Sequence, residues 1–257
     1  MTINLSNICA VSVVGGTGKR LRPFTNDRPK ALLPVGIEKT PMLEFTMTPW
    51  LKNGIKNYVF CVGYKGEMIE EHFGDGSKFG ARIEYSREKD NLETGGAIKN
   101  AIDNKKLKIE YPTIVFYCDD IVRLNVKNFI DSHIKGVKEF GFKASVVATN
   151  KFRTQYGIME IENLEKGMKK VINFEEKPLI SKYVNVGIYF FEPEVLEMIN
   201  KHEPPFKFES VILPKLARKG WLMLHGISHE DWIPVNTDKD YESVLKMNLT
   251  DFYAKVL

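Results

Sequence analysis

The sequence predicts an α/β protein with a mainly parallel central sheet flanked by helices, followed by a mixed, partly antiparallel portion. Three short runs rich in β-branched and aromatic residues, at 8–14, 58–62 and 113–117, are typical of strands buried on both faces. Helical patterns lie around them at 42–53, 67–73, 96–104 and 126–137. Such alternation favours parallel strands joined by right-handed crossovers, with a ligand site beyond the carboxyl ends of the strands.

The pattern changes after about residue 143. Four strand candidates follow with few helices among them, at 143–149, 157–162, 168–174 and 184–191, and we expect this half to close over one side of the site. Helices are predicted at 194–200 and 210–218. A final helix is predicted from residues that would form one face: Tyr241, Val244, Leu245, Asn248, Leu249, Phe252 and Val256. If this apolar face is exposed, it is a candidate homo-oligomer interface.

Composition bounds the class of protein. The 257 residues are 43% hydrophobic and 27% charged, as in an ordinary folded protein, and we expect one domain spanning 1–257. The net charge is +4 with no long run of one sign, and basic and aromatic residues do not interleave on one strand, so we expect no nucleic-acid partner. No apolar run approaches a membrane span, and the start of the chain lacks the pattern of a signal peptide. With three widely spaced cysteines read as free thiols, these features predict a cytoplasmic protein with no membrane partner.

A glycine-rich loop follows the first predicted strand. Gly15, Gly16 and Gly18 carry no Cβ, so their backbone N–H groups can be approached closely by phosphate oxygens. Arg20 can bind phosphate with its two-pronged guanidinium, and Lys30 offers a movable point charge. The loop therefore predicts a site for a ligand with several phosphates.

Two common phosphate motifs fit this loop poorly. A Walker loop requires Ser or Thr after Gly-Lys, where this chain has Arg20, and a dinucleotide fold requires a third glycine opening a helix, where Pro23 follows instead. The run Gly-Gly-x-Gly-x-Arg-Leu, then Pro-x-Thr, Pro-Lys and Leu-x-Pro-Val within 13–36 resembles the signature of the sugar-1-phosphate nucleotidyltransferases, also called sugar-nucleotide pyrophosphorylases. No hexapeptide repeat follows the final predicted helix, so the resemblance is to the short form without a left-handed β-helix.

The resemblance implies a fold and a reaction. The fold is the Rossmann-like nucleotide-diphospho-sugar transferase type, with a nucleotide-binding portion at about 1–142 and a sugar-binding portion at about 143–257. The reaction transfers a nucleotidyl group from a nucleoside triphosphate to a sugar 1-phosphate by Mg²⁺-dependent direct displacement at the α-phosphorus, forming an NDP-sugar and pyrophosphate. The family's catalytic cations correspond to Lys30, near the α-phosphate and the sugar phosphate, and Arg20, near the leaving pyrophosphate.

Further nucleotide contacts are implied by the same loop and by the segment at 91–98. That segment resembles a helix start of the family, in which Thr94 would cap the helix and Gly95 would allow close approach. A simple capped helix without a ligand role is the alternative. The base stays open, because Glu93 and Cys118 stand where glycine is usual; the nucleotide contacts are predicted at Val14, Gly15, Gly16, Thr17, Gly18, Lys19, Glu93, Thr94, Gly95 and Cys118.

A magnesium site is implied by two positions. Asp119 follows the 113–117 strand where the family has its strand-end metal ligand, and Asn236 falls near the second ligand, which is commonly an aspartate. An amide in place of a carboxylate should weaken metal binding when no nucleotide is present. The alternative for both residues is an ordinary capping or turn position.

Sugar-phosphate contacts are implied by three pieces of the second half. They assign Gly157 to the space for the sugar ring, Glu176 and Asn185 to its hydroxyls, and Lys177 to the phosphate. Each piece alone is common on protein surfaces, and their order and spacing carry the assignment. A rival function is a regulatory subunit that binds a nucleotide sugar without turnover, which Asn236 favours and the retained Arg20, Lys30 and Asp119 oppose.

Overall fold

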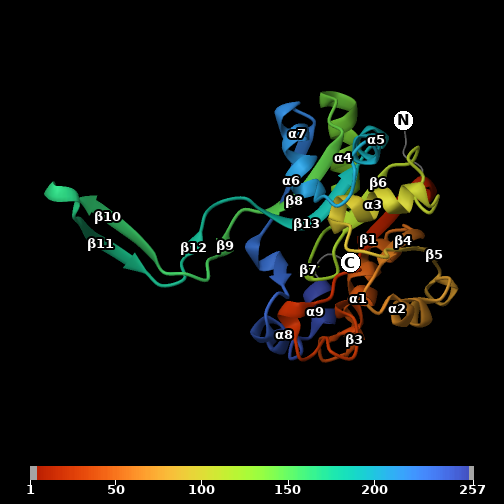
Figure 1. Ribbon diagram of the computed structural model, residues 1–257, viewed down its shortest axis with the longest axis horizontal. Coiled ribbons are helices and arrows are strands. Elements are labelled where there is room, and N and C mark those ends of the chain that lie inside the picture. Colours follow the sequence, from red (N-terminus) through yellow and green to blue (C-terminus); the bar gives the residue numbers. More distant parts are fainter. Residues whose placement is uncertain (1–4, 255–257) are drawn as a thin grey trace.

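The computed structural model describes residues 5–254, and its body is built on a seven-stranded sheet (Figure 1). The strand order is β14-β8-β13-β6-β1-β4-β5. β13 runs antiparallel to both of its neighbours, and every other neighbouring pair is parallel. This confirms the predicted α/β class. The strands are β1 (Cys9–Val13), β4 (Asn57–Val62), β5 (Arg82–Arg87), β6 (Thr113–Phe116), β8 (Ala144–Thr149), β13 (Val184–Phe191) and β14 (Leu222–Ile227).

Helices cover both faces of the sheet. Side chains alternate along the central strands, so that in β4 Tyr58 and Phe60 join one core cluster while Val59 and Cys61 join the other. The first cluster packs under α1 (Met42–Lys52), α2 (Gly66–Phe73), α4 (Val126–Phe140), α8 (Asp238–Val244) and α9 (Leu249–Tyr253). The second packs under α3 (Glu93–Asp103), α5 (Pro193–Asn200), α6 (Phe208–Val211) and α7 (Leu213–Arg218).

Two strands of the sheet escaped prediction. β5 and β14 lie at the two edges, where β5 has only two buried residues and β14 has none. Charged Arg82, Glu84 and Arg87 interrupt β5, so it lacks the continuous apolar run of a central strand. Edge strands are therefore the elements that an apolar pattern finds least well.

The predicted final helix is two helices, and its apolar face is not exposed. Asn248 accepts a hydrogen bond from the N–H of Asp251 and so caps a new helix, α9, after α8 has ended. Val244 and Leu249 are fully buried against the rest of the same chain. The face therefore does not meet the condition of exposure under which it would be a candidate homo-oligomer interface. Val256 lies outside the described residues. The predicted 210–218 helix is likewise divided, into α6 and α7.

The second half does not close over the site as expected. β8 and β13 join the main sheet, whereas β10 (Ile158–Asn163) and β11 (Lys169–Glu175) form a hairpin that projects far from the body (Figure 1). β9 (Phe152–Arg153) pairs with β12 (Leu179–Ile180) between the hairpin and the body. We call residues 152–180 the arm.

Short elements complete the fold. β2 (Pro34–Val35) pairs with β3 (Thr40–Pro41), and β7 (Asp120–Val122) pairs with β15 (Trp232–Pro234). Six turns of 3₁₀-helix occur in the described residues, at Leu5–Asn7, Lys19–Leu21, Lys30–Leu32, Ser77–Phe79, Glu165–Gly167 and His229–Asp231. Among the described residues, none of the helices has both the length and the apolar character that crossing a membrane requires.

Candidate active site

A cavity of about 500 Å³ lies beyond the carboxyl ends of β1 and β6. This is where ligands bind in open α/β sheets. Three segments line it: the loop after β1 with the turn at Lys30, the chain from the end of β5 to the start of α3, and the residues after β6, joined by two side chains near α6. The lining residues are Val13, Val14, Gly15, Gly16, Gly18, Lys19, Arg20, Leu21, Lys30, Ala31, Glu88, Asn91, Glu93, Thr94, Tyr117, Cys118, Asp119, Lys207 and Glu209.

The glycine loop has the open backbone that the sequence predicts. Nothing lies within 4 Å of the place where a Cβ of Gly16 would stand, so a ligand can approach the main chain there. Gly18 has a positive φ of 61°, and a Cβ on it would come within 2.9 Å of the Thr25 side chain. Thr25 in turn donates a 2.9 Å hydrogen bond from Oγ1 to the carbonyl oxygen of Gly18. These contacts fix the shape of the loop.

We expect Gly18→Ala to lower the free energy of unfolding by about 1–3 kcal/mol, because the new Cβ adds a left-handed backbone penalty and a clash with Thr25. Urea denaturation measures it. Gly16→Ala is the matched control, since its Cβ meets open space and its φ is not in the left-handed region. Equal stability of the two variants would contradict this account of the loop.

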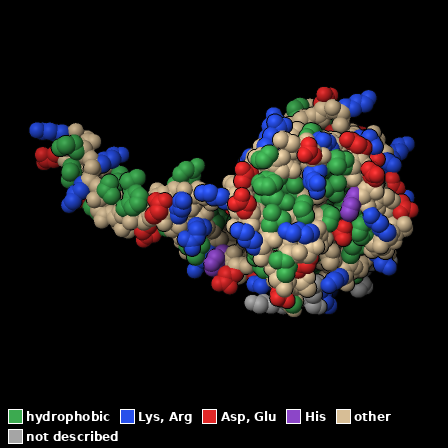
Figure 2. Space-filling view, turned by 90° about the horizontal axis from the view of Figure 1, so that it is seen from below, with side chains coloured by type: hydrophobic (Ala, Val, Ile, Leu, Met, Phe, Trp, Pro, Cys, Tyr) green, Lys and Arg blue, Asp and Glu red, His purple; other side chains and the backbone are tan. Residues whose placement is uncertain are grey.

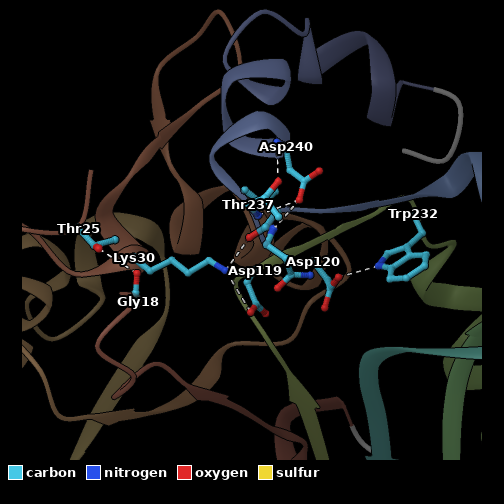
Figure 3. A network of polar contacts seen from close by, with 10 residues as sticks. Gly18, Thr25, Lys30, Asp119, Asp120, Trp232, Thr237 and Asp240 are labelled. Carbon is cyan, nitrogen blue, oxygen red and sulfur yellow. Dashed lines mark hydrogen bonds and ion pairs between the residues drawn. The ribbon is translucent and has the colours of Figure 1, made fainter. Parts of the chain in front are cut away.

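Lys30 connects three segments that are distant in sequence (Figure 3). Its Nζ donates to Oδ2 of Asp119 at 3.2 Å and to the carbonyl oxygen of Val235 at 2.7 Å. The Val235 N–H donates back to the carbonyl oxygen of Asp119 at 2.9 Å. The lysine is placed by a 3₁₀ turn that follows Pro29 and is anchored by buried Ala31. Its side chain is 14% exposed and lines the cavity, where its two hydrogen bonds hold the ammonium in place.

Two more cations line the same cavity. Arg20 and Lys19 belong to the turn that follows Gly18. Within the described part of the chain, the Arg20 guanidinium has no hydrogen-bond or ion-pair partner, so all of its donors are available to a ligand. The cavity thus brings together Arg20, Lys30 and Asp119, the three side chains on which the predicted chemistry depends.

Asp119 and Asn236 have the donor chemistry for magnesium. The backbone bond between Asp119 and Val235 holds the two segments side by side, and a carboxylate and an amide oxygen are the hard ligands that Mg²⁺ prefers. No group of three or more His, Cys, Asp or Glu suited to a metal occurs in residues 5–254. A metal here would therefore take few protein ligands and complete its shell with phosphate and water, as Mg²⁺ commonly does.

Asp120 is a supporting residue of this site. Its Oδ1 accepts a 2.7 Å hydrogen bond from the indole N–H of Trp232, which points toward it in Figure 3. Burial, with the Asp119 carboxylate beside it, raises the pKa of Asp120 above its usual range. After β15, which pairs with β7, Thr237 and Asp240 form a capping box that begins α8 and fixes the chain after Asn236.

The start of α3 differs in detail from the expectation. The helix begins at Glu93 with Leu92 at the capping position, so Thr94 is not its N-cap. The Thr94 hydroxyl instead donates a hydrogen bond to Oε2 of Glu209. Gly95 is needed for packing, because a Cβ there would overlap the ring of Phe206. Glu93 has a positive φ of 59°, which explains why glycine suits this position in proteins that the motif resembles.

Five polar lining residues were missed by sequence reasoning: Glu88, Asn91, Tyr117, Lys207 and Glu209. Burial raises the pKa of Glu88, and burial together with the Glu209 carboxylate raises that of Tyr117, whose hydroxyl donates to Oε1 of Glu209. Glu88 follows β5, so recognition of that edge strand would have located it. Nothing in the local pattern around Glu209 indicates that α6 borders the cavity.

The structure leaves several predicted residues outside the cavity lining. Thr17 and Gly95 are adjacent in sequence to lining residues. Asn236 follows Val235, whose N–H donates a hydrogen bond to the carbonyl oxygen of the lining residue Asp119. Asn185 is at the start of β13, where its side chain contacts Tyr189 and Gly187. Gly157, Glu176 and Lys177 are on the arm, and no residue of the arm lines the cavity. Their proposed contacts with a sugar phosphate remain predictions.

Comparison with known proteins finds relatives over most of the chain. The family model described as "Nucleotidyl transferase" matches residues 9–247. A UTP–glucose-1-phosphate uridylyltransferase from Synechocystis sp. is 28% identical over 92% of this chain, which spans 62% of that longer protein. A D-glycero-α-D-manno-heptose 1-phosphate guanylyltransferase from Aneurinibacillus thermoaerophilus is 31% identical over 92% of this chain and 96% of its own.

A solved structure has the same fold. HddC from Yersinia pseudotuberculosis superposes with a TM-score of 0.66 and 24% identity, covering 92% of this chain and 97% of its own. The match to the family model includes the glycine loop, the strand of Asp119 and the segment of Asn236. The chain therefore belongs to the nucleotidyl transferase family, and its uridylyltransferase and guanylyltransferase relatives are both named as enzymes of sugar 1-phosphates.

Proposed function

We propose that this protein transfers a nucleotidyl group from a nucleoside triphosphate to a sugar 1-phosphate, releasing pyrophosphate, with Mg²⁺ as cofactor. The observation that carries the proposal is that Arg20, Lys30 and Asp119 line one cavity beside an open glycine loop. Both reactants are anionic, so cations at their meeting point offset repulsion that would otherwise oppose reaction.

Each side chain has a part in the proposed transfer. A lysine ammonium has three N–H donors, and in Lys30 two of them bond Asp119 and Val235, which leaves the third for a phosphate oxygen. Arg20, with its guanidinium unpaired within residues 5–254, can bind the leaving pyrophosphate in a bidentate manner. Mg²⁺ held by Asp119 and Asn236 would add positive charge beside the reacting phosphate. The attack is a direct displacement that needs no protein nucleophile.

Glu88 supports a choice of nucleotide. The Synechocystis and Aneurinibacillus relatives are named for different bases, so similarity alone does not choose between them. The Glu88 carboxyl lines the cavity, and one of its oxygens stands 3.0 Å from where a Cβ of Gly15 would be. Guanine presents adjacent N1–H and N2–H donors to a carboxylate, whereas uracil and thymine present carbonyl oxygens on both sides of a single N–H. We therefore propose guanosine triphosphate as the preferred donor.

We expect Glu88→Gln to weaken this preference. An amide can offer an N–H donor to a uracil carbonyl and loses one acceptor for guanine, so the ratio of kcat/KM for GTP over UTP should fall about tenfold or more. Steady-state kinetics with both triphosphates measures it. Glu71→Gln, at an exposed carboxylate of α2, is the control and should leave the ratio unchanged. An unaltered ratio in Glu88→Gln would remove Glu88 from base recognition.

A grid of reactants tests the proposed function itself. Pyrophosphate release is measured with Mg²⁺ for each of GTP, UTP, CTP and dTTP combined with glucose, mannose and heptose 1-phosphates. Release in at least one combination, and none when magnesium is chelated, is the expected result. Nucleotide-sugar binding without release in every combination would favour the regulatory-subunit alternative.

A further inference from the structure

A second cavity lies at the edge of the main sheet opposite to the candidate active site. Its volume is about 200 Å³, and it is bordered by the first residues of the parallel strands β1, β4 and β5 and by the segment after α3. Within residues 5–254, no residue lines both cavities. The second cavity is lined by Ser6, Asn7, Cys9, Asn57, Tyr58, Val59, Arg82, Glu84, Lys105, Lys106, Lys108 and Tyr111.

The charge of this second cavity is strongly unbalanced. Figure 2 shows acidic and basic side chains intermingled over one face of the body. The second cavity instead has four cationic side chains, those of Arg82, Lys105, Lys106 and Lys108, and a single carboxylate, Glu84. Glu84 accepts hydrogen bonds from Lys106 at 2.8 Å and from Arg82 at 2.9 Å, and these bonds lower the pKa of Glu84. The carboxylate therefore stays ionised at neutral pH, and four cations against it leave an excess of three positive charges.

Two of the lysines have no carboxylate partner. Within the described part of the chain, the ammonium groups of Lys105 and Lys108 make no ion pair or hydrogen bond. The Lys108 Nζ lies 5.7 Å from the centre of the Tyr111 ring, a contact that leaves its charge uncompensated. Since both lysines line one cavity, an anion bound there is attracted by both of them.

The end of α3 explains only part of this charge. The N–H groups of Lys105 and Lys106 donate at 2.9 Å to the carbonyl oxygens of Ile102 and Ala101, which closes the helix, and Lys105 has a positive φ of 57°. A helix C-terminus carries about half a negative charge, so nearby cations stabilise it and an anion is opposed by it. The excess of three positive charges is several times larger. The field in the cavity therefore favours an anionic ligand.

The remaining lining can contact an uncharged part of a ligand. Tyr58 and Val59 are each only 1% exposed and give the cavity a rigid wall on β4. Asn57 donates Nδ2 to the carbonyl oxygen of Ser6 at 2.7 Å, which leaves its Oδ1 to accept from a ligand hydroxyl. Within residues 5–254, the Tyr111 hydroxyl makes no hydrogen bond, so it can donate to a ligand or accept from one.

The volume restricts the class of anion. Pockets for drug-sized ligands measure about 300–1,000 Å³, so a cavity of about 200 Å³ is too small for a whole nucleotide. At about 30 Å³ for each water, it has room for about seven waters, or for one phosphate on a short carbon chain. A phosphate monoester carries about −1.5 to −2 charges at pH 7, which the excess positive charge can neutralise.

We propose that this cavity binds a small organic phosphate, a monoester whose short carbon chain carries hydroxyl groups. Lys105 and Lys108 bind the phosphate, while Asn57 and Tyr111 contact the hydroxyls. The proposal does not depend on the proposed transfer reaction, because it uses none of the residues to which that reaction is assigned.

Isothermal titration calorimetry of the full chain with glycerol 3-phosphate tests the site. Binding should be saturable and should weaken as NaCl is added, because salt screens the attraction between exposed charges. Glycerol, which has the hydroxyls without the charge, should not bind. No binding of glycerol 3-phosphate overturns the proposal, and inorganic phosphate that binds as tightly as glycerol 3-phosphate overturns the choice of an organic ligand.

Matched double variants test which lysines bind the phosphate. Lys105→Gln with Lys108→Gln removes two charges without adding repulsion and should weaken the binding of glycerol 3-phosphate about tenfold or more. Lys135→Gln with Lys138→Gln, at two exposed lysines of α4, changes the net charge equally and should leave the affinity unaltered. Thermal unfolding midpoints show whether each variant remains folded. Equal affinities in the two double variants overturn the proposal.

A third variant distinguishes the two cavities. Arg20→Ala with Lys30→Ala removes two cations of the candidate active site and should retain the binding of glycerol 3-phosphate to the second cavity. Loss of all binding in this variant, together with unaltered binding in Lys105→Gln with Lys108→Gln, would place the phosphate in the active-site cavity alone and overturn the proposal. Titration without a nucleotide keeps this result separate from any test of turnover.

Discussion

Replacing Lys30 by alanine should lower kcat by about a hundredfold to a thousandfold while the protein stays folded. The ammonium is the positive charge that the structure holds in place, through Asp119 and Val235, at the cavity. A group positioned in advance stabilises the charge that develops during transfer without first having to be ordered. Pyrophosphate release measures the loss, and the thermal unfolding midpoint shows whether the fold is retained.

The control for this variant is Lys89→Ala. Lys89 is exposed and follows Glu88 close to the cavity, but it does not line the cavity. Its removal changes the net charge by the same amount and should leave kcat within about a factor of two, as expected for an exposed charge. Near-normal turnover in Lys30→Ala, or an equal loss in Lys89→Ala, would exclude Lys30 from the transfer step.

The second large effect is expected for Asp119→Asn. The amide has nearly the shape of the carboxylate but no charge, so it should preserve the hydrogen bond from Lys30 and weaken the attraction for Mg²⁺. We expect kcat at fixed magnesium to fall about a hundredfold or more, and the magnesium concentration for half-maximal activity to rise. Titrating pyrophosphate release with MgCl₂ measures both effects.

Asp131→Asn, at an exposed carboxylate of α4 that pairs with Lys127, controls for the change in charge. It should titrate with magnesium as the wild-type protein does. If Asp119→Asn reached half-maximal activity at the same magnesium concentration as the wild-type protein, Asp119 would not be a metal ligand.

The sequence predicted the site best where residues with suitable side chains follow a strand that its apolar pattern identifies. The glycine loop and Asp119 follow the ends of β1 and β6, two central strands whose apolar patterns are continuous, and the turn at Lys30 belongs to the same sequence motif as the loop. In a parallel sheet those ends meet at one edge, so short motifs far apart in the chain could be assigned to one site.

The rest depends on tertiary contacts that local patterns do not record. Glu209 reaches the cavity because α6 packs beside α3, where Phe206 fills the space left by Gly95. The strand patterns at 158–163 and 169–175 were recognised, but the same alternation is compatible with packing on the body or projecting from it. Which of the two occurs is decided by the connections through β9 and β12, and no local pattern in the chain signals it.

A crystal structure with a non-hydrolysable GTP analogue and Mg²⁺ tests most directly whether the three side chains act at one place. We expect a triphosphate along the glycine loop, with Lys30 on an α-phosphate oxygen, Arg20 on the β- and γ-phosphates, and the metal on Asp119. A nucleotide whose phosphates lie outside this cavity, or a metal bound away from Asp119, would contradict it.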